Sequence, residues 1–311
     1  MARIIVAGVV NVRVAHQVDA FPVPFLSSQR RRDGISVRLS GTGWTIACTA
    51  QRLGSDPIFA TYVGADSLGQ LAIQGLQERG LYGPTTLVCD AQPRALVLYD
   101  RDGRRANTSD LRSVPDLRYP VDVFASAMDS WPACHAAVLT NVGFTRSLIP
   151  AAVDRGIPIA SDLHLVCDIE DIKNRDWMRV AHILACSHER LPVPPETWIR
   201  LLWQRFATEI TLVGCGADGA VLGVRSARAI WRIPSLTPRG VTYTSGAGDT
   251  LLASFVHHYV TLGDPVAAAQ HAVLTAGWKV GAHPDDEVGI TSTDLRELRR
   301  LHGLPLAQRM T

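Results

Sequence analysis

The stretch Thr244-Ser245-Gly246-Ala247-Gly248-Asp249-Thr250, followed directly by the apolar-periodic run LLASFVHHYV, carries the strongest structural signal in this chain. Small residues that lead straight into a helix leave several backbone N–H groups unpaired. These groups lie at the positive end of the helix dipole, where phosphate oxygens bind readily. The stretch therefore predicts an anion site at the start of a helix that runs from about 248 to 261.

Asp249 lies at the same helix start. A carboxylate is favoured there and stays ionised, yet it would lie beside any bound phosphate. That placement costs energy unless the carboxylate has a task, and the obvious task is to accept a proton from a substrate hydroxyl. An ordinary capping or first-turn role explains Asp249 equally well from spacing alone, so both interpretations stay open at this point.

The composition is typical of a soluble globular protein. The 311 residues are 47% hydrophobic and 19% charged, and 31 basic against 29 acidic side chains give a net charge of +2. These values exclude a disordered chain, and 25 glycines exclude a collagen-like one. A near-neutral balance also argues against nucleic acid as the partner.

The cysteines and the apolar runs indicate a cytoplasmic protein. Six cysteines are spread singly, without a C-x-x-C pair or structural-zinc spacing, as in a reducing compartment. Residues 4–10 are apolar, but Asn11 and Arg13 end the run, so we interpret it as a buried strand rather than a signal peptide. No apolar stretch approaches the roughly 18 residues of a membrane span.

Short apolar runs alternate with helical patterns, which is typical of βαβ units and a mostly parallel sheet. We expect one α/β domain over residues 1–311 with central strands at 3–10, 58–64, 136–141, 157–162, 182–187 and 209–214. Residues 14–40 and 84–107 break the rhythm, because they contain strand-like pieces such as TTLVC and RALVLYD without a convincing helix. They predict a small second sheet that lies on the main domain.

Other glycine-rich segments are less specific. Gly214-Cys215-Gly216-Ala217-Asp218-Gly219 fits G-x-G-x-x-G, but the alternating residues after it predict a hairpin strand instead of the helix that a dinucleotide site requires. Gly41-Thr42-Gly43 precedes a helical stretch and would let the backbone approach a ligand closely, although a tight loop needs glycine equally. The sequence contains no P-loop and no G-x-S-x-G, and the histidines show no metal spacing, so we expect surface or core histidines.

In order and spacing, these segments resemble the ribokinase-like, or PfkB, family of carbohydrate kinases over nearly the whole chain. TSGAGDT resembles the family signature D-T-x-G-A-G-D, and SGTGWTIACTAQRLG at 40–54 resembles G-G-x-G-x-N-x-A with its helix. YVGADSLGQ at 62–70 and GADGAVL at 216–222 are similar to two further family motifs. The resemblance implies a three-layer α/β sandwich with a small β lid.

The resemblance also implies an activity and site residues. Asp249 would be the catalytic base, and the amides of Gly246, Ala247 and Gly248 would form the anion hole for the γ-phosphoryl group of ATP. ATP with Mg²⁺ would be handled by a group at the ends of two later strands, namely Ser187, Gly214, Gly216, Gly219 and, as metal residue, Glu189. In many relatives the lid is also a dimer surface, which leaves a homodimer open for this chain.

Several positions depart from the family pattern on the nucleotide side. Tyr243 stands where the signature begins with Asp, a residue that helps to hold a monovalent cation in potassium-activated relatives. We therefore do not expect a monovalent-cation requirement. The N-x-x-E motif is replaced by Ser187-His188-Glu189-Arg190, Gly214 replaces a hydroxyl residue, and Ala65 replaces the first Asp of V-G-D-D. These changes predict altered handling of magnesium-ATP.

The substrate side departs as well. Sugar-binding relatives show N-x-D at the end of the first strand, where this chain has Asn11-Val12-Arg13, and a guanidinium cannot accept a hydrogen bond. Thr45 replaces a sugar-contacting Asn, within a signature whose glycines are Gly41 and Gly43. Arg94 takes a position where sugar-phosphate kinases carry a phosphate-binding Arg. Two arginines near one pocket would suit an anionic group, although surface or ion-pair roles explain them equally.

The sequence therefore predicts an ATP-dependent kinase for a small carbohydrate, with an anionic sugar or sugar phosphate as the favoured class. A nucleoside kinase of the same fold is the nearest alternative. A sugar or nucleotide sensor that has lost its magnesium chemistry is the alternative from another class. The predicted partners are the small molecule and ATP, without nucleic acid or a membrane.

Overall fold

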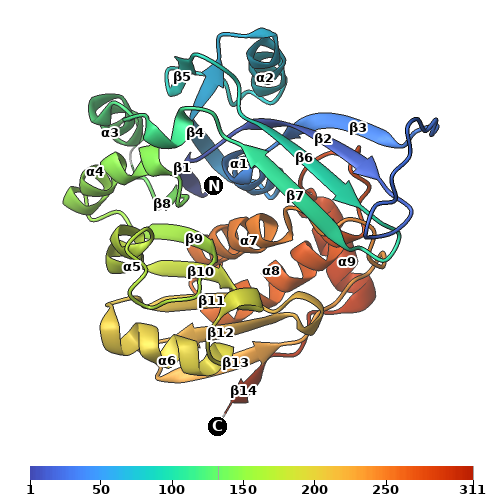
Figure 1. The fold of residues 1–311 in the computed structure, drawn as a ribbon. Coiled ribbons are helices and arrows are strands. Elements are labelled where there is room, and N and C mark those ends of the chain that lie inside the picture. The colour runs from blue at the N-terminus through green and yellow to red at the C-terminus, as the bar shows by residue number, and fades with distance from the viewer. Residues whose placement is uncertain (132, 311) are drawn as a thin grey trace.

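The computed structural model describes residues 1–131 and 133–310 of the chain, and two sheets organise this part (Figure 1). Within these residues the larger sheet has ten strands, in the order β14-β13-β12-β11-β10-β9-β8-β1-β4-β5. The seven strands from β11 to β5 in that order run parallel, while β12, β13 and β14 add antiparallel at one edge. The predicted mostly parallel sheet is confirmed.

Most strands of this sheet are short, buried and apolar, because helices cover both faces, while the two edge strands are partly exposed. They are β1 (Arg3–Ala7), β4 (Asp56–Gly64), β5 (Thr86–Cys89), β8 (Ala136–Leu139), β9 (Ile159–Leu165), β10 (Ile183–Ser187), β11 (Ile210–Gly214), β12 (Ala220–Val224), β13 (Ala229–Ile233) and β14 (Gln308–Met310). Each of the six predicted central strands corresponds to one of them, with ends that differ by at most three residues.

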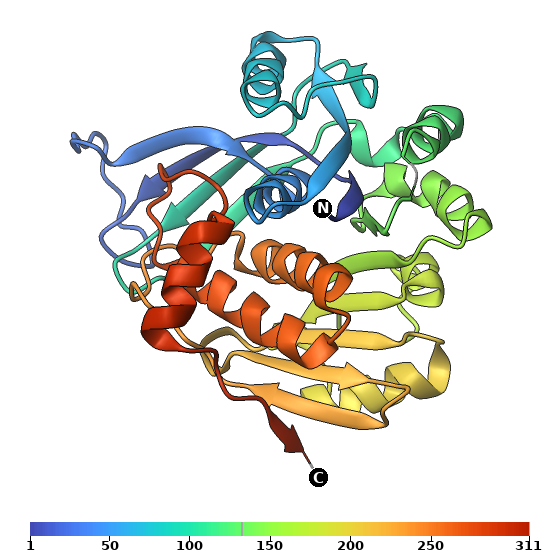
Figure 2. The same cartoon turned by 180° about the vertical axis from the view of Figure 1, so that it is seen from behind.

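The helices form a layer on each face of the sheet (Figures 1 and 2). One apolar core lies against α1 (Thr42–Arg52), α2 (Ser67–Glu78), α7 (Ala247–Leu262) and α8 (Pro265–Val280). The other lies against α3 (Val121–Asp129), α4 (Ile149–Asp154), α5 (Arg175–Val180) and α6 (Pro195–Arg205). Helix α9 (Ser292–His302) packs on the first layer through Leu295. No described helix combines the length and the apolar character that crossing a membrane requires.

The second sheet consists of β2 (Asn11–Gln17), β3 (Ile35–Ser40), β6 (Arg94–Tyr99) and β7 (Arg105–Asp110), in the order β3-β2-β6-β7. It lies above α7 and α8 in Figure 1, as a lid would. The stretch TTLVC was expected here, but it forms β5, which pairs in parallel with β4 of the main sheet. Because helix α2 separates β4 from β5, the three elements form a βαβ unit, and the lid strands resume only at Arg94.

Short 3₁₀ helices connect these elements, among them η1 (Val114–Asp116), η2 (Gly143–Leu148), η3 (His188–Arg190) and η4 (Gly216–Asp218). Two helices, α2 and α8, begin at a capping aspartate. The Asp66 carboxylate accepts a hydrogen bond from the Gly69 N–H at 2.9 Å, and the Asp264 carboxylate accepts one from the Val266 N–H at 2.8 Å.

Candidate active site

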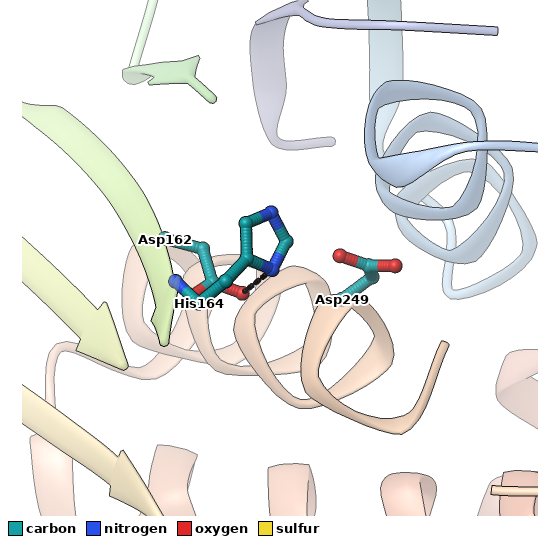
Figure 3. A group of neighbouring side chains, drawn as sticks. All are labelled: Asp162, His164 and Asp249. Atoms are coloured by element: carbon teal, nitrogen blue, oxygen red, sulfur yellow. Dashed lines mark hydrogen bonds and ion pairs between the residues drawn. The ribbon is translucent and has the colours of Figure 1, made fainter. Parts of the chain in front are cut away.

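Helix α7 and strand β9 bring Asp249, Asp162 and His164 together (Figure 3). A carboxylate oxygen of each aspartate and a ring nitrogen of the histidine lie within 4.8 Å of one another. Strand β9 supplies its two residues at its carboxyl end. In open α/β sheets this edge is where ligands bind, so Asp249 lies at a candidate active site.

The start of α7 leaves free hydrogen-bond donors beside Asp249. Gly246 is the N-cap and adopts a left-handed conformation with φ 82°, which glycine allows without strain. The Ala247 N–H donates to the Thr244 carbonyl at 3.3 Å. Within the described part of the chain, the N–H groups of Gly246, Gly248 and Asp249 have no acceptor. Of the three amides predicted for the anion hole, those of Gly246 and Gly248 are free and that of Ala247 is engaged, while the Asp249 amide is free as well.

Asp249 itself is half-buried. Burial is the main cause that raises the pKa of its carboxyl, to about 6, and the negative charge of Asp162 raises it further. Three groups lower the pKa: His164, Arg105 and the hydroxyl of Thr42. A base with a pKa near neutral pH accepts a proton well while remaining mostly ionised. The environment therefore suits the predicted catalytic role.

His164 was not predicted as a site residue, because the histidines were expected at the surface or in the core. Its backbone has φ 56°, a left-handed conformation, and its N–H donates to Asp162 Oδ1 at 2.8 Å. Its Nδ1 lies 3.6 Å from Asp162 Oδ2, and its Nε2 lies 3.4 Å from Thr42 Oγ1. Although burial lowers the pKa of His164, the carboxylates of Asp162 and Asp249 together raise it above its ordinary value. The pattern Asp-x-His at the end of a buried strand was the signal available in the sequence.

The start of helix α1 adjoins the start of α7, and glycines make this approach possible. A Cβ at Gly41, which has φ 106°, would lie 2.5 Å from the Val9 carbonyl oxygen, and one at Gly43 would lie 2.6 Å from the Gly8 carbonyl carbon. Thr45, one turn later, is buried, and its Cγ2 lies 3.6 Å from where a Cβ on Gly246 would be. The two predicted signatures therefore meet in space.

Two predicted substrate residues lie on the lid strand β2. Asn11 is buried, and within residues 1–131 and 133–310 no group donates a hydrogen bond to its Oδ1. An unpaired buried acceptor costs about 1–3 kcal/mol, so a ligand hydroxyl would stabilise it. Arg13 is also buried; its Nη2 donates to the Pro284 carbonyl at 2.6 Å, and its guanidinium lies 5.3 Å from the centre of the Tyr243 ring.

Arg94 does not join Arg13 in one pocket. The lid register pairs Arg13 with Ala95, and Arg94 with Val12. Directly paired residues point to the same face, and successive residues point to opposite faces, so the two arginines lie on opposite faces of the lid. Arg94 instead forms an ion pair with Asp66 at 3.5 Å. Arg13 and Arg94 therefore do not share the pocket expected from the sequence. The sequence does not reveal the register between β2 and β6, which decides the face of the lid on which each arginine lies.

The predicted nucleotide residues gather at the carboxyl ends of two adjacent parallel strands. Ser187 of β10 pairs with Gly214 of β11, and the Gly214 carbonyl lies 3.0 Å from Nδ1 of His188. Gly216 has φ 57° and lies against the His188 ring. Gly219 closes a turn, since a Cβ there would lie 2.1 Å from the Ile233 carbonyl oxygen. Strand β12 then runs antiparallel to β11, which confirms the hairpin interpretation and excludes the dinucleotide one.

The carboxylates present fit a magnesium ion, which prefers oxygen ligands. Asp162, whose side chain is 6% exposed, and Asp249 offer such oxygens close together. Glu189, the predicted metal residue, is exposed on η3, where its N–H donates to Ser187 Oγ at 3.3 Å. Among the residues that the structure describes, Glu189 is not part of the group around Asp249, so its metal role remains a prediction.

A doubly covered, mostly parallel sheet, a four-stranded lid and a carboxylate at the glycine-rich start of a helix together define the ribokinase-like fold. No protein-family model and no curated protein sequence matches the chain. Solved structures do. A microbiome-derived acarbose kinase shares 22% identity at a TM-score of 0.83, with 96% of this chain and 98% of that chain covered.

Two further structures show the range of the likeness. Ribokinase of Arabidopsis thaliana, complexed with ribose and ATP, shares 16% identity at a TM-score of 0.76, over 96% of this chain and 99% of that one. A nucleoside kinase of Burkholderia thailandensis, in complex with inosine, shares 14% sequence identity at a TM-score of 0.73. The match covers 97% of this chain and 99% of that one. At these identities the likeness establishes the fold, and the expected fold class is confirmed.

Proposed function

We propose that the chain is an ATP-dependent kinase that transfers the γ-phosphoryl group to a hydroxyl of a small carbohydrate. The observation that carries this proposal is the Asp249 carboxylate beside the free N–H groups of Gly246 and Gly248. One group can take a proton while its neighbours hold the negative charge of a phosphoryl group. The acarbose kinase and the ribokinase of the same fold support the assignment.

The chemistry is an in-line displacement. The substrate oxygen forms a bond to the γ-phosphorus while the bond from that phosphorus to the leaving oxygen of ADP breaks, and the hydroxyl proton goes to Asp249. The free amides stabilise the charge that develops on the transferred group, so the protein acts by positioning and electrostatics. Magnesium, which neutralises phosphate charge when bound, would be held by Asp162 beside Asp249. Glu189 and Ser187, which lie outside this group, would act on the nucleotide side.

The substrate would lie between the lid and the starts of α1 and α7. Asn11 and Thr45 offer polar groups to sugar hydroxyls, and Gly41 and Gly43 shape the backbone beneath. Arg13 is the residue that favours an anionic sugar or sugar phosphate, since no described carboxylate forms an ion pair with it. Arg94 is excluded from this part of the proposal because it lies on the other face of the lid.

A substrate panel tests the proposal. Neutral sugars, sugar phosphates, sugar acids and nucleosides are each offered with ATP, and ADP release is measured. Turnover with any sugar class supports the kinase. Turnover confined to neutral sugars would contradict the anionic preference, and absence of turnover with every class would contradict the kinase.

Two other functions rest on particular observations. The nucleoside kinase in complex with inosine has the same fold, and turnover confined to the nucleoside arm of the panel would favour that function. The replaced N-x-x-E motif and the exposed position of Glu189 favour a sensor. If calorimetry shows that the protein binds a sugar and ATP while no product forms, the protein is a sensor.

The outer face of the lid supports a homodimer. Val37, Val14 and Leu96 form a cross-strand row on the face opposite Arg13, and Val37 and Leu96 are 52% and 45% exposed. A second copy would cover this row in a self-complementary contact. Analytical ultracentrifugation of the parent and of Val37→Glu tests it: a parent dimer that the variant loses supports the proposal, and a monomeric parent contradicts it.

A further inference from the structure

Lys279 lies at the end of α8, directly behind the turn that opens α7. Its Cε is 3.8 Å from the position that a Cβ on Gly246 would occupy. Its Nζ donates to the Tyr243 carbonyl at 3.4 Å and lies 5.1 Å from the centre of the Tyr243 ring. The amine is therefore held against the main chain that leads into the anion hole.

This amine has little access to water, and no carboxylate within residues 1–131 and 133–310 forms an ion pair with it. Lys279 is 9% exposed. Three arginines add positive charge around the amine: Arg13 of β2, Arg105 of β7 and Arg239 of the loop before α7. The negative charge of Asp286 opposes them. The Asp286 carboxylate, however, accepts a hydrogen bond from the His283 N–H at 2.9 Å, and no described carboxylate forms an ion pair with Lys279. A buried cation without a partner is costly, so a bound anion would stabilise it.

The choice of lysine is unusual for this chain. Its 31 basic residues comprise 29 arginines and two lysines, and the second lysine, Lys173, is exposed. An arginine keeps its charge at every accessible pH, whereas an amine is compact and can lose its proton when it is buried. The buried position behind Gly246 thus carries the rarer, titratable cation.

We propose, on the basis of the kinase function proposed above, that Lys279 is a positioning residue for phosphoryl transfer. Its ammonium group fixes the turn from Tyr243 to Gly246 and places a positive charge behind the amides that receive the transferred group. In a site of low dielectric such a fixed charge stabilises developing negative charge strongly. Binding of the anion and protonation of Lys279 then favour each other, because each lowers the cost of the other.

A pH dependence follows from this geometry. Burial lowers the pKa of Lys279 to about 8, and the charges of Arg13, Arg105 and Arg239 add to this effect. Asp286 raises the pKa, but only weakly. The charge is present below this pH and is lost above it. The parent enzyme should therefore lose kcat/KM as the pH rises through about 8. Lys279→Arg should show no such alkaline limb, and Lys279→Met should be at least about tenfold slower at pH 7.

Calorimetry of ATP binding gives a readout that does not need turnover. At pH 8.5, in two buffers of different ionisation enthalpy, the parent should take up protons as ATP binds, because the phosphates restore the charge of Lys279. Lys173→Arg, the matched control at the exposed lysine, should behave like the parent, and Lys279→Arg should take up none. Equal proton uptake by Lys279→Arg and the parent would overturn the inference.

The two proposals can fail separately. If no substrate is phosphorylated but proton uptake depends on Lys279, the kinase assignment fails and the linkage between Lys279 and the anion stands. If the parent is an active kinase and Lys279→Met and Lys279→Arg keep its pH profile, the role of Lys279 is refuted. Should Lys279→Met fail to fold, Lys279→Arg still gives both readouts.

Discussion

A carboxylate oxygen of Asp249 and a ring nitrogen of His164 lie within 4.8 Å of each other, although one residue comes from α7 and the other from β9 (Figure 3). Burial alone would push the Asp249 carboxyl toward its protonated form, which cannot act as a base. His164 opposes this effect with its positive charge. The histidine therefore helps to keep the Asp249 carboxyl ionised near neutral pH.

Removal of His164 should shift the pH dependence of the reaction. In His164→Ala the pKa of Asp249 rises above its present value of about 6, because the lowering charge is gone. A base is active when it is deprotonated, so the acid limb of kcat/KM should move to higher pH, with a loss of about tenfold at pH 6.5. His302→Ala, at an exposed histidine of α9, should leave the profile unchanged. An unmoved acid limb in His164→Ala would contradict this role.

The two ends of α7 offer a matched pair of glycines. Gly246 has φ 82° and Gly263 has φ 70°, so alanine should cost about 1–2 kcal/mol of unfolding free energy at either position. Only Gly246→Ala should also weaken phosphoryl transfer, by about tenfold or more, because its turn presents the amides proposed to bind the phosphoryl group. Denaturant unfolding and ADP release measure the two effects. Equal activity of the two variants would show that the turn is not part of the site.

The arginines of the lid should differ in their effects. Arg13→Ala removes a buried guanidinium that contacts Tyr243 and Pro284, so KM for the substrate should rise about tenfold or more. Arg94→Ala breaks a half-exposed ion pair with Asp66, which contributes no more than about 1 kcal/mol, and KM should stay within about twofold. Substrate titrations of both variants check this. A larger KM effect at Arg94 would reverse the assignment.

Two histidines of α7 should make the fold sensitive to acid. Burial, aided by His271, lowers the pKa of His257 to about 4 and that of His258 to about 3. The unfolded chain takes up protons near pH 6.5 and the folded protein does not, so stability is full above pH 6.5 and falls as the pH decreases toward 4 and 3. The loss should be about 2 kcal/mol per histidine at pH 5.

Denaturant unfolding at pH 7.5 and 5.0 measures this loss. A His257→Gln, His258→Gln double variant should lose much less stability between the two pH values than the parent does. A parent whose unfolding free energy is the same at both pH values would contradict the prediction.

Local signals were sufficient for most of the fold, but pairings between distant segments were not. Continuous apolar runs located the central strands, and the small residues of 244–248 marked the start of α7. The strand 86–89 was assigned to the wrong sheet, because residue preference alone cannot say which neighbour a strand pairs with. Asp249 was singled out because the backbone donors beside it are its neighbours in sequence.

The rest of the site depends on contacts between segments that are far apart. Asp162 and His164 reach Asp249 from a strand some 85 residues earlier in the sequence, and Lys279 reaches Gly246 from the far end of another helix. Arg94 was misplaced because its face depends on the register between β2 and β6. Each of these relationships is set by the tertiary fold and leaves no local pattern.

The most direct test of the central claim compares Asp249→Asn with the parent. The amide keeps the size and the free N–H groups of the helix start but cannot accept the hydroxyl proton, so kcat should fall by about 10²–10⁴. ATP binding, measured by calorimetry, should stay within about threefold, because the donors that hold the phosphates remain. An Asp249→Asn protein that turns over at the parent rate would show that Asp249 is not the base.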